Sequence, residues 1–96
     1  MATSVLVDGK TLLLNPFMST LIGNVVQAVA RSLKTPQGSR IHFALRGEEV
    51  TLRIDEQQVP LNLGHAQQIV GNILQGITRS LKGAEACRNF EFIYEL

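Results

Sequence analysis

The sequence predicts an α+β fold, a two-layer sandwich in which an antiparallel or mixed sheet carries two helices on one face. Three observations lead to this prediction. A twelve-residue stretch occurs twice, at positions 23–34 and 71–82, with seven identical residues and helical periodicity. Segments of alternating apolar and polar residues surround both copies, as in strands with one buried face. An Asp-Gly-Lys turn separates the first two of these segments, and this is a strong hairpin signal.

The first half of the chain begins with two short strands. Residues 5–7 form the first expected strand, and the chain turns at Asp8-Gly9. Residues 11–14 return as the second strand, and three leucines in a row predict a central position with apolar contacts on both faces. Residues 40–46 alternate between apolar and polar side chains, so a third strand with one buried face follows the first helix.

The first helix is expected over residues 16–34. Asn15 is a typical N-cap, and Pro16 suits the first helical position. Gly23 costs roughly 1 kcal/mol relative to alanine inside a helix, and Gly71 holds the equivalent position in the second copy. A glycine at the edge of the apolar arc lets another backbone approach closely. We therefore predict that the two helices pack side by side, with their glycines near a pseudo-two-fold axis. The expected buried residues of the first helix are Met18, Ile22, Val25, Val26, Val29 and Leu33.

The second half repeats the order strand, strand, helix, strand. The expected elements are a strand at 50–54, a looser turn at 55–58, a returning strand at 59–61, a helix at 64–82 and a strand at 89–96. Pro60 restricts its strand to a sheet edge or a non-bonded site, and Asn62 is the expected cap of the helix. The expected buried residues of this helix are Ala66, Val70, Ile73, Leu74, Ile77 and Leu81.

The two halves, about residues 4–46 and 49–96, join without a flexible linker. We therefore predict a single domain, residues 1–96, in which two ββαβ units related by an internal pseudo-two-fold axis share one sheet. The nearest analogue is a ferredoxin-like plait, if each early hairpin is counted as one long bent strand. The chain then resembles a fused homodimer in which each unit covers the apolar surface of the other.

The composition excludes several classes of protein. An apolar fraction of 45% is typical of a globular domain, and a net charge of +1 gives no general attraction to nucleic acid or anionic membranes. Cys87 is the only cysteine, which rules out an internal disulfide and fits a reducing compartment. Because no basic n-region or long apolar run follows Met1, neither a signal peptide nor a membrane span is expected. The expected location is the cytoplasm.

Three short motifs occur in the first half, Val7-Asp8-Gly9-Lys10, Leu14-Asn15-Pro16-Phe17 and Ser32-Leu33-Lys34. They resemble the D-G-K, L-N-x-F and S-L-K-G pattern of short prokaryotic proteins of uncharacterised function. In the second half Pro60-Leu61-Asn62 and Ser80-Leu81-Lys82-Gly83 fit this pattern, whereas Asp55-Glu56-Gln57 departs from it. The resemblance implies no activity, ligand or catalytic residue.

Few residues in the chain offer chemistry. His42, His65 and Cys87 could form a metal site, but their spacing matches no usual zinc pattern, and surface histidines are expected instead. A nucleophilic Cys87 would need a base and an orienting group, which its neighbours in sequence do not supply. Asp8 and Asp55 could form a carboxylate pair, but hairpin turns favour aspartate for local backbone bonding. We therefore predict no catalytic residue, no metal and no cofactor, and the sequence leans away from an enzyme.

The best candidate surface lies on the outer faces of the two helices. Polar residues recur there at equivalent positions, namely Asn24, Gln27, Arg31 and Lys34 in the first helix and Asn72, Gln75, Arg79 and Lys82 in the second. One interpretation of the basic residues is compensation of the negative helix ends. The other is an anion or nucleic-acid surface, extended by Arg40, Arg46 and Arg53 and diluted by the glutamates at 48, 49, 91 and 95.

Three functions stay open. The favoured one is a small non-catalytic interaction or oligomerisation module that binds a protein or a second copy through its outer sheet face or strand edges. Ala44 and Ile93 are the apolar residues expected on that face. The second is a nucleic-acid or anion-binding protein that uses the basic helix ends. The third is a small ligand carrier or enzyme with a pocket between the sheet and the helices, for which the sequence names no set of residues. A deep polar pocket around His42 or Cys87 would support it. No membrane partner is expected.

Overall fold

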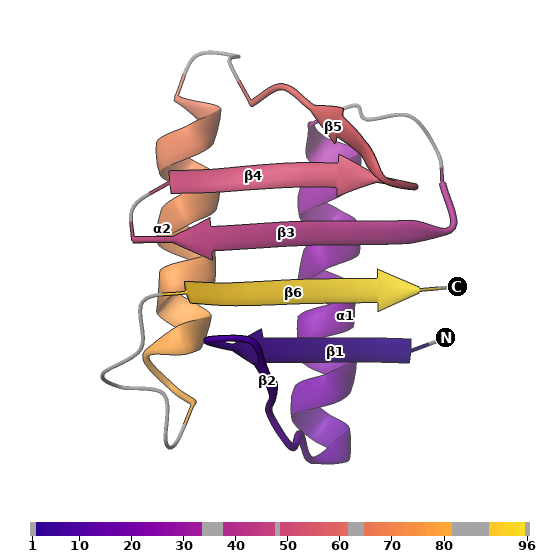
Figure 1. The fold of residues 1–96 in the computed structure, drawn as a ribbon, viewed down its shortest axis with the longest axis vertical. Coiled ribbons are helices and arrows are strands. Elements are labelled where there is room, and N and C mark those ends of the chain that lie inside the picture. Colours follow the sequence, from indigo (N-terminus) through magenta and orange to yellow (C-terminus); the bar gives the residue numbers. More distant parts are fainter. Residues whose placement is uncertain (1, 34–37, 48, 62–64, 82–88, 96) are drawn as a thin grey trace.

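A computed structural model describes residues 2–33, 38–47, 49–61, 65–81 and 89–95. Its elements are β1 (Ala2–Val7), β2 (Lys10–Thr11), α1 (Pro16–Ser32), β3 (Arg40–Arg46), β4 (Glu49–Ile54), β5 (Gln57–Val59), α2 (Ala66–Thr78) and β6 (Asn89–Glu95). The strands form one sheet in the order β2-β1-β6-β3-β4-β5, and every neighbouring pair is antiparallel. Both helices lie on one face of this sheet (Figure 1). The predicted α+β two-layer sandwich is confirmed.

The strand order places the last strand of each half at the centre of the sheet. β3 pairs with β6 along its whole length, while β1 and β4 flank this central pair. α1 connects β1 to β3 with β6 between them, and α2 connects β4 to β6 with β3 between them. Split β-α-β crossovers of this kind also occur in the ferredoxin-like plait. Two ββαβ units related by a pseudo-two-fold axis would give this order, although the duplication itself stays an inference from the sequence.

The core lies between the inner face of the sheet and the helices. Phe43 and Phe92 are fully buried and face each other across the central strand pair. Ile22 and Val26 of α1 and Leu74 of α2 belong to the same buried cluster. Full burial of one such side chain contributes about 1.5–3 kcal/mol. Because both helices cover this one cluster, the two halves share their hydrophobic stabilisation.

The two hairpins have turns of the same length. Each loop has two residues, Asp8-Gly9 and Asp55-Glu56, because the residues on either side pair directly. The φ angles of these four residues are 50°, 83°, 49° and 68°. Positive φ at both central positions is the type I′ geometry that matches the twist of the strands. The first turn agrees with the prediction, whereas the looser second turn is wrong because pairing already begins at Gln57.

The strand predicted at 11–14 is wrong in length and position. β2 has two residues and lies at the edge of the sheet. The N–H of Leu12 still donates to the carbonyl of Val5 (2.8 Å), but the chain then leaves the sheet to enter α1. Leu12 and Leu14 pack against the core, while Leu13 is 96% exposed. The three leucines therefore alternate between core and solvent, and they do not mark a strand buried on both faces.

The opposite edge of the sheet is also short. β5 covers Gln57–Val59, so the returning strand lies earlier than the predicted 59–61. Pro60 follows the strand and so removes no hydrogen bond from the ladder. β2 and β5 are edge strands that cover only part of their neighbours, because β2 pairs with Leu6 and Val7 of β1 and β5 with residues 52–54 of β4. In the described residues, the first halves of β1 and β4 have no strand partner on their outer side.

The helices begin in different ways. Asn15 caps α1 as predicted, since its Oδ1 accepts a hydrogen bond from the N–H of Met18 (2.8 Å). His65 precedes α2 and makes no side-chain cap hydrogen bond, while the predicted cap Asn62 lies outside the described residues. α1 ends two residues before the predicted position 34. Neither of the two helices in the described ranges combines the length and hydropathy needed to cross a bilayer.

Gly23 packs against the sheet. A Cβ at this position would lie 2.7 Å from Oγ1 of Thr3 and 3.2 Å from Cδ1 of Tyr94. The missing side chain thus lets α1 approach β1 and β6 closely. The prediction that Gly23 meets the other helix is wrong, because its flank of α1 faces the strands. Gly71 is buried in α2.

Candidate functional site

The helix layer carries exposed apolar side chains from both helices. Phe17 is 70% exposed, Leu21 40%, Ile69 56% and Ile73 40%. We call these four residues the apolar strip. Leu21 lies two residues before Gly23 and Ile69 two residues before Gly71, so they precede the two repeated stretches at equivalent positions. Large apolar side chains gathered on one face are typical of a protein–protein contact surface, whereas scattered ones need no explanation.

The direction of the strip follows from the position of Gly23. Residues two positions apart point about 200° away from each other around a helix. Because Gly23 packs against Thr3 and Tyr94 of the sheet, Leu21 lies on the side of α1 that faces away from these strands. The two helices run in opposite directions, so equivalent flanks face each other (Figure 1). Ile69 lies two residues before the buried Gly71, so it likewise faces away from the core on α2.

Sequence reasoning missed one member of the strip. Ile73 was expected in the core, and that prediction is wrong. The buried residues of α2 include Val70, Gly71, Leu74 and Thr78. These residues show that the centre of the buried face of α2 lies nearer to Gly71 than the centre of the predicted apolar arc does. Ile73 therefore lies at the rim of the buried face, where it stays partly exposed.

The two helices carry almost no charge. α1 contains one charged residue, Arg31, and α2 contains none. All eight acidic residues of the chain lie outside the two helices. A helix that faces water usually places charged residues opposite its apolar stripe, whereas the centre of a protein interface is depleted of charge. The helix layer is therefore depleted of charge, as the centre of a protein interface is.

The predicted amide residues lie on or beside this layer. Asn24 and Asn72 are exposed at equivalent positions of the two helices. Gln27 and Gln75 are half-buried and bind backbone, because Nε2 of Gln27 donates to the carbonyl of Gly23 (3.1 Å) and Nε2 of Gln75 to that of Gly47 (3.4 Å). The two asparagines are therefore the predicted amides with the most exposed side chains.

The two predicted basic residues of the helix ends that the structure describes do not converge. Arg31 and Arg79 are exposed near the C-terminal ends of α1 and α2. Since the helices run in opposite directions, these ends lie at opposite ends of the helix layer (Figure 1). Lys34 and Lys82 lie outside the described residues. Arg31 and Arg79 therefore do not form one basic patch.

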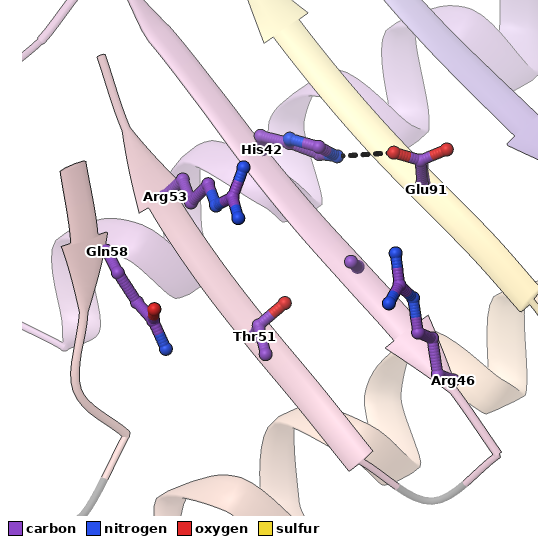
Figure 2. A pocket seen from close by; sticks show the side chains of 7 residues that line it. His42, Arg46, Thr51, Arg53, Gln58 and Glu91 are labelled. Carbon is purple, nitrogen blue, oxygen red and sulfur yellow. Dashed lines mark hydrogen bonds and ion pairs between the residues drawn. The ribbon is translucent and has the colours of Figure 1, made fainter. Parts of the chain in front are cut away.

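The described helices leave the outer face of the sheet uncovered, and this face is polar (Figure 1). It contains a hollow of about 180 Å³, lined by His42, Ala44, Arg46, Thr51, Arg53, Gln58 and Glu91 (Figure 2). Nε2 of His42 and Oε1 of Glu91 are 2.9 Å apart. Ala44 is buried and Ile93 half-buried, so the two apolar residues expected here form no exposed apolar patch.

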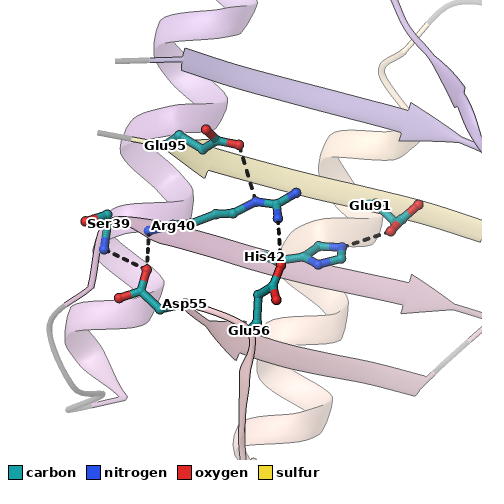
Figure 3. A network of polar contacts seen from close by, with 7 residues as sticks. All are labelled: Ser39, Arg40, His42, Asp55, Glu56, Glu91 and Glu95. Atoms are coloured by element: carbon teal, nitrogen blue, oxygen red, sulfur yellow. Dashed lines mark hydrogen bonds and ion pairs between the residues drawn. The ribbon is translucent and has the colours of Figure 1, made fainter.

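A network of charged groups lies at one end of this face (Figure 3). Arg40 lies between two carboxylates, with 3.6 Å from Nη1 to Oε1 of Glu56 and 3.3 Å from Nε to Oε1 of Glu95. The Nε atom is buried and makes no well-directed hydrogen bond, so the contact with Glu95 is electrostatic. Oδ1 of Asp55 accepts the backbone N–H groups of Ser39 (2.9 Å) and Arg40 (3.0 Å).

Among the residues considered for catalysis or metal binding, those that the structure describes lie apart. Asp8 and Asp55 are at opposite ends of the sheet, because β1 and β4 run in opposite directions (Figure 1). Oδ1 of Asp8 accepts the N–H of Asn89 (3.2 Å), so both aspartates bind the start of a neighbouring strand. His42 lies on β3 and His65 before α2, while Cys87 is outside the described residues. Within the ranges that the structure describes, no three His, Cys, Asp or Glu side chains could hold a metal ion together.

Comparisons of the chain with models of protein families, with curated proteins and with solved structures gave no match. The functional interpretation therefore rests on the geometry of the helix layer and the sheet face.

Proposed function

We propose that this protein is a small non-catalytic oligomerisation module that pairs with a second copy of itself through the helix layer. The observation that carries this proposal is the exposed apolar strip on two helices that contain no acidic residue. Water contact with four large apolar side chains is unfavourable, and burial against a partner removes it. The apolar face that sequence reasoning expected on the sheet is thus replaced by one on the helices.

A second copy is the partner that this surface fits best. Most homodimers pair through the same patch on both subunits, so the patch must be complementary to itself. The strip meets this condition, because α1 and α2 run in opposite directions and present Leu21 and Ile69 at equivalent positions. A surface without acidic groups also meets its own copy with little like-charge repulsion. Asn24 and Asn72 each offer a donor and an acceptor to the partner's amides.

Light scattering coupled to size-exclusion chromatography tests this proposal. The wild-type protein is expected to elute with the mass of a dimer. Phe17→Glu and Ile69→Glu are expected to raise the dimer Kd at least about tenfold, because burial of an unpaired carboxylate is costly. Gln58→Glu is the matched control, since it adds the same charge at an exposed site on the opposite face of the sheet. It is expected to leave the dimer unchanged.

Circular dichroism spectra of the variants check that the fold is intact. Phe17 and Ile69 are more than half exposed, so a carboxylate there does not burden the core of the single chain. Wild-type protein that stays monomeric at all concentrations contradicts the proposal. So does a folded Ile69→Glu variant that still dimerises like the wild type.

The anion or nucleic-acid alternative has weaker support. Arg31 and Arg79 lie at opposite ends of the helix layer and so cannot neutralise adjacent phosphates together. A binder of this kind would be retained on heparin at low salt and released as the salt concentration rises. Flow-through of the protein at low salt would remove this alternative.

A further inference from the structure

We propose that the hollow on the uncovered face of the sheet binds a small oxyanion, the size of phosphate or sulfate. The hollow lies on the opposite side of the sheet from the helix layer, so this inference is independent of the proposed dimer. It depends on the arginines of the face, on the arrangement of donors around Ala44, and on the size of the hollow.

The arginines on this face differ in their partners. Arg40 is matched by the carboxylates of Glu56 and Glu95. Arg46 and Arg53 form no ion pair with any other residue in the described ranges. Two guanidinium groups on one sheet face without a matching carboxylate attract an anion.

The described carboxylates nearest to Arg46 and Arg53 form no ion pair with these two arginines. The Glu91 carboxylate lines the hollow but is bound to His42 at 2.9 Å. Glu49 is the cross-strand neighbour of Arg46, yet the two side chains form no ion pair. The hollow therefore contains two guanidinium groups and one carboxylate.

The strand register arranges the donors in a ring. Ala44 lies opposite Thr51 on β4 and opposite Glu91 on β6. His42 and Arg46 are the next residues of β3 on the same face, and Arg53 is the cross-strand neighbour of His42. Because Ala44 has a short, buried side chain, the longer side chains around it leave a hollow.

These groups supply the chemistry that an oxyanion needs. Guanidinium groups bind phosphate and carboxylate oxygens through parallel N–H bonds. Figure 2 shows Arg46, Thr51 and Arg53 on the same face, with Gln58 on the side of β5. The Thr51 hydroxyl and the Gln58 amide add uncharged donors. At about 180 Å³ the hollow is smaller than the roughly 300–1,000 Å³ of drug-sized sites, so it suits one small group.

Titration of the ¹⁵N-labelled protein with inorganic phosphate, followed by NMR, tests the site. Saturable shifts are expected at the arginine Nε–Hε resonances of Arg46 and Arg53 and at the Thr51 amide. Arg46→Gln and Arg53→Gln are each expected to weaken phosphate binding at least about tenfold, since each removes a charged hydrogen-bond donor. Arg79→Gln is the matched control, because this exposed arginine lies in the helix layer. It is expected to bind like the wild type.

Three results would overturn the inference. They are the absence of saturable shifts, equal shifts at Arg31 and Arg79, or an unchanged affinity in both folded variants of the hollow. The same titration with O-phosphoserine distinguishes the sources of the anion. Tighter binding than that of inorganic phosphate identifies an esterified phosphate and weaker binding a free anion, and either result supports an oxyanion site.

Discussion

The two halves of the chain form the same elements with different local chemistry. In the first half Gly9 fills the second position of the turn, and Asn15 caps a helix of 17 residues. In the second half Glu56 holds the equivalent turn position at a φ of 68°, and a helix of 13 residues begins without a side-chain cap. Local sequence signals are thus weaker in the second half, although its strands and its helix occupy places in the fold equivalent to those of the first half.

Long-range hydrogen bonds accompany these weaker local signals. Oε1 of Gln67, in the first turn of α2, accepts the N–H of Val50 on β4. Asp55 binds two backbone N–H groups where its counterpart Asp8 binds one. The second half of the chain therefore depends more on contacts with the rest of the molecule. Three predictions test this difference, beginning with the largest expected effect.

The shared core sets the largest effect. Phe43 belongs to the first half and Phe92 to the second, and both are fully buried as cross-strand neighbours. Phe43→Ala and Phe92→Ala are each expected to lower the free energy of unfolding by about 3–5 kcal/mol, through lost burial and cavity formation. Urea denaturation followed by fluorescence and circular dichroism measures this. Both variants should unfold in one transition.

Two separate transitions, or a loss confined to one half, would show that the halves fold independently. Phe43→Leu and Phe92→Leu cover the case in which an alanine variant fails to fold, because a smaller loss of volume costs less. The double variant is expected to deviate from additivity, since the two side chains are in the same cross-strand pair.

The two aspartates set an intermediate effect. Asp55→Ala is expected to cost about 1–2 kcal/mol more than Asp8→Ala, because one more N–H loses a charged acceptor. The two residues have φ angles of 49° and 50°, so alanine introduces the same backbone strain at both positions. Each variant is therefore the control for the other in thermal or urea denaturation. Equal costs would break the comparison between the hairpins.

The second turn sets the smallest effect. Glu56→Gly is expected to raise the free energy of unfolding by about 1 kcal/mol, because a residue other than glycine pays about 1–2 kcal/mol at positive φ. The lost contact with Arg40 is exposed and contributes little. Glu56→Ala removes the same contact while keeping the strain, and it should change stability very little. A stabilised alanine variant would locate the effect in the charge and not in the backbone.

Much of the fold could be predicted because its signals are local and periodic. The arc containing Ile22, Val26 and Val29 predicted the buried face of α1, and the alternation of Phe43 with its neighbours predicted β3. The errors lie where the periodicity is ambiguous. Leu13 stands in a run of apolar residues that fits a buried strand as well as a turn, and tertiary contacts resolved it as exposed.

The candidate site was predicted only in part. Sequence reasoning selected the polar residues Asn24 and Asn72 on the outer helix faces, and it missed the apolar residues beside them. The absence of acidic residues from both helical stretches was a visible signal that could have marked this layer. The hollow on the sheet was predicted only in part. The sequence marked Arg46 and Arg53 as part of a possible anion surface, but their position around Thr51 depends on the register of β3 and β4.

By itself the sequence determined the element order, the first hairpin turn, the cap of α1 and the buried face of each central strand. These features depend on neighbours within a few residues, so period, turn chemistry and capping specify them. Only the tertiary structure decided that β6 lies between β1 and β3, that Gly23 packs against strands and not against a helix, and that Ile73 is partly exposed. Each of these depends on surfaces distant in the chain, whose relative placement no local pattern encodes.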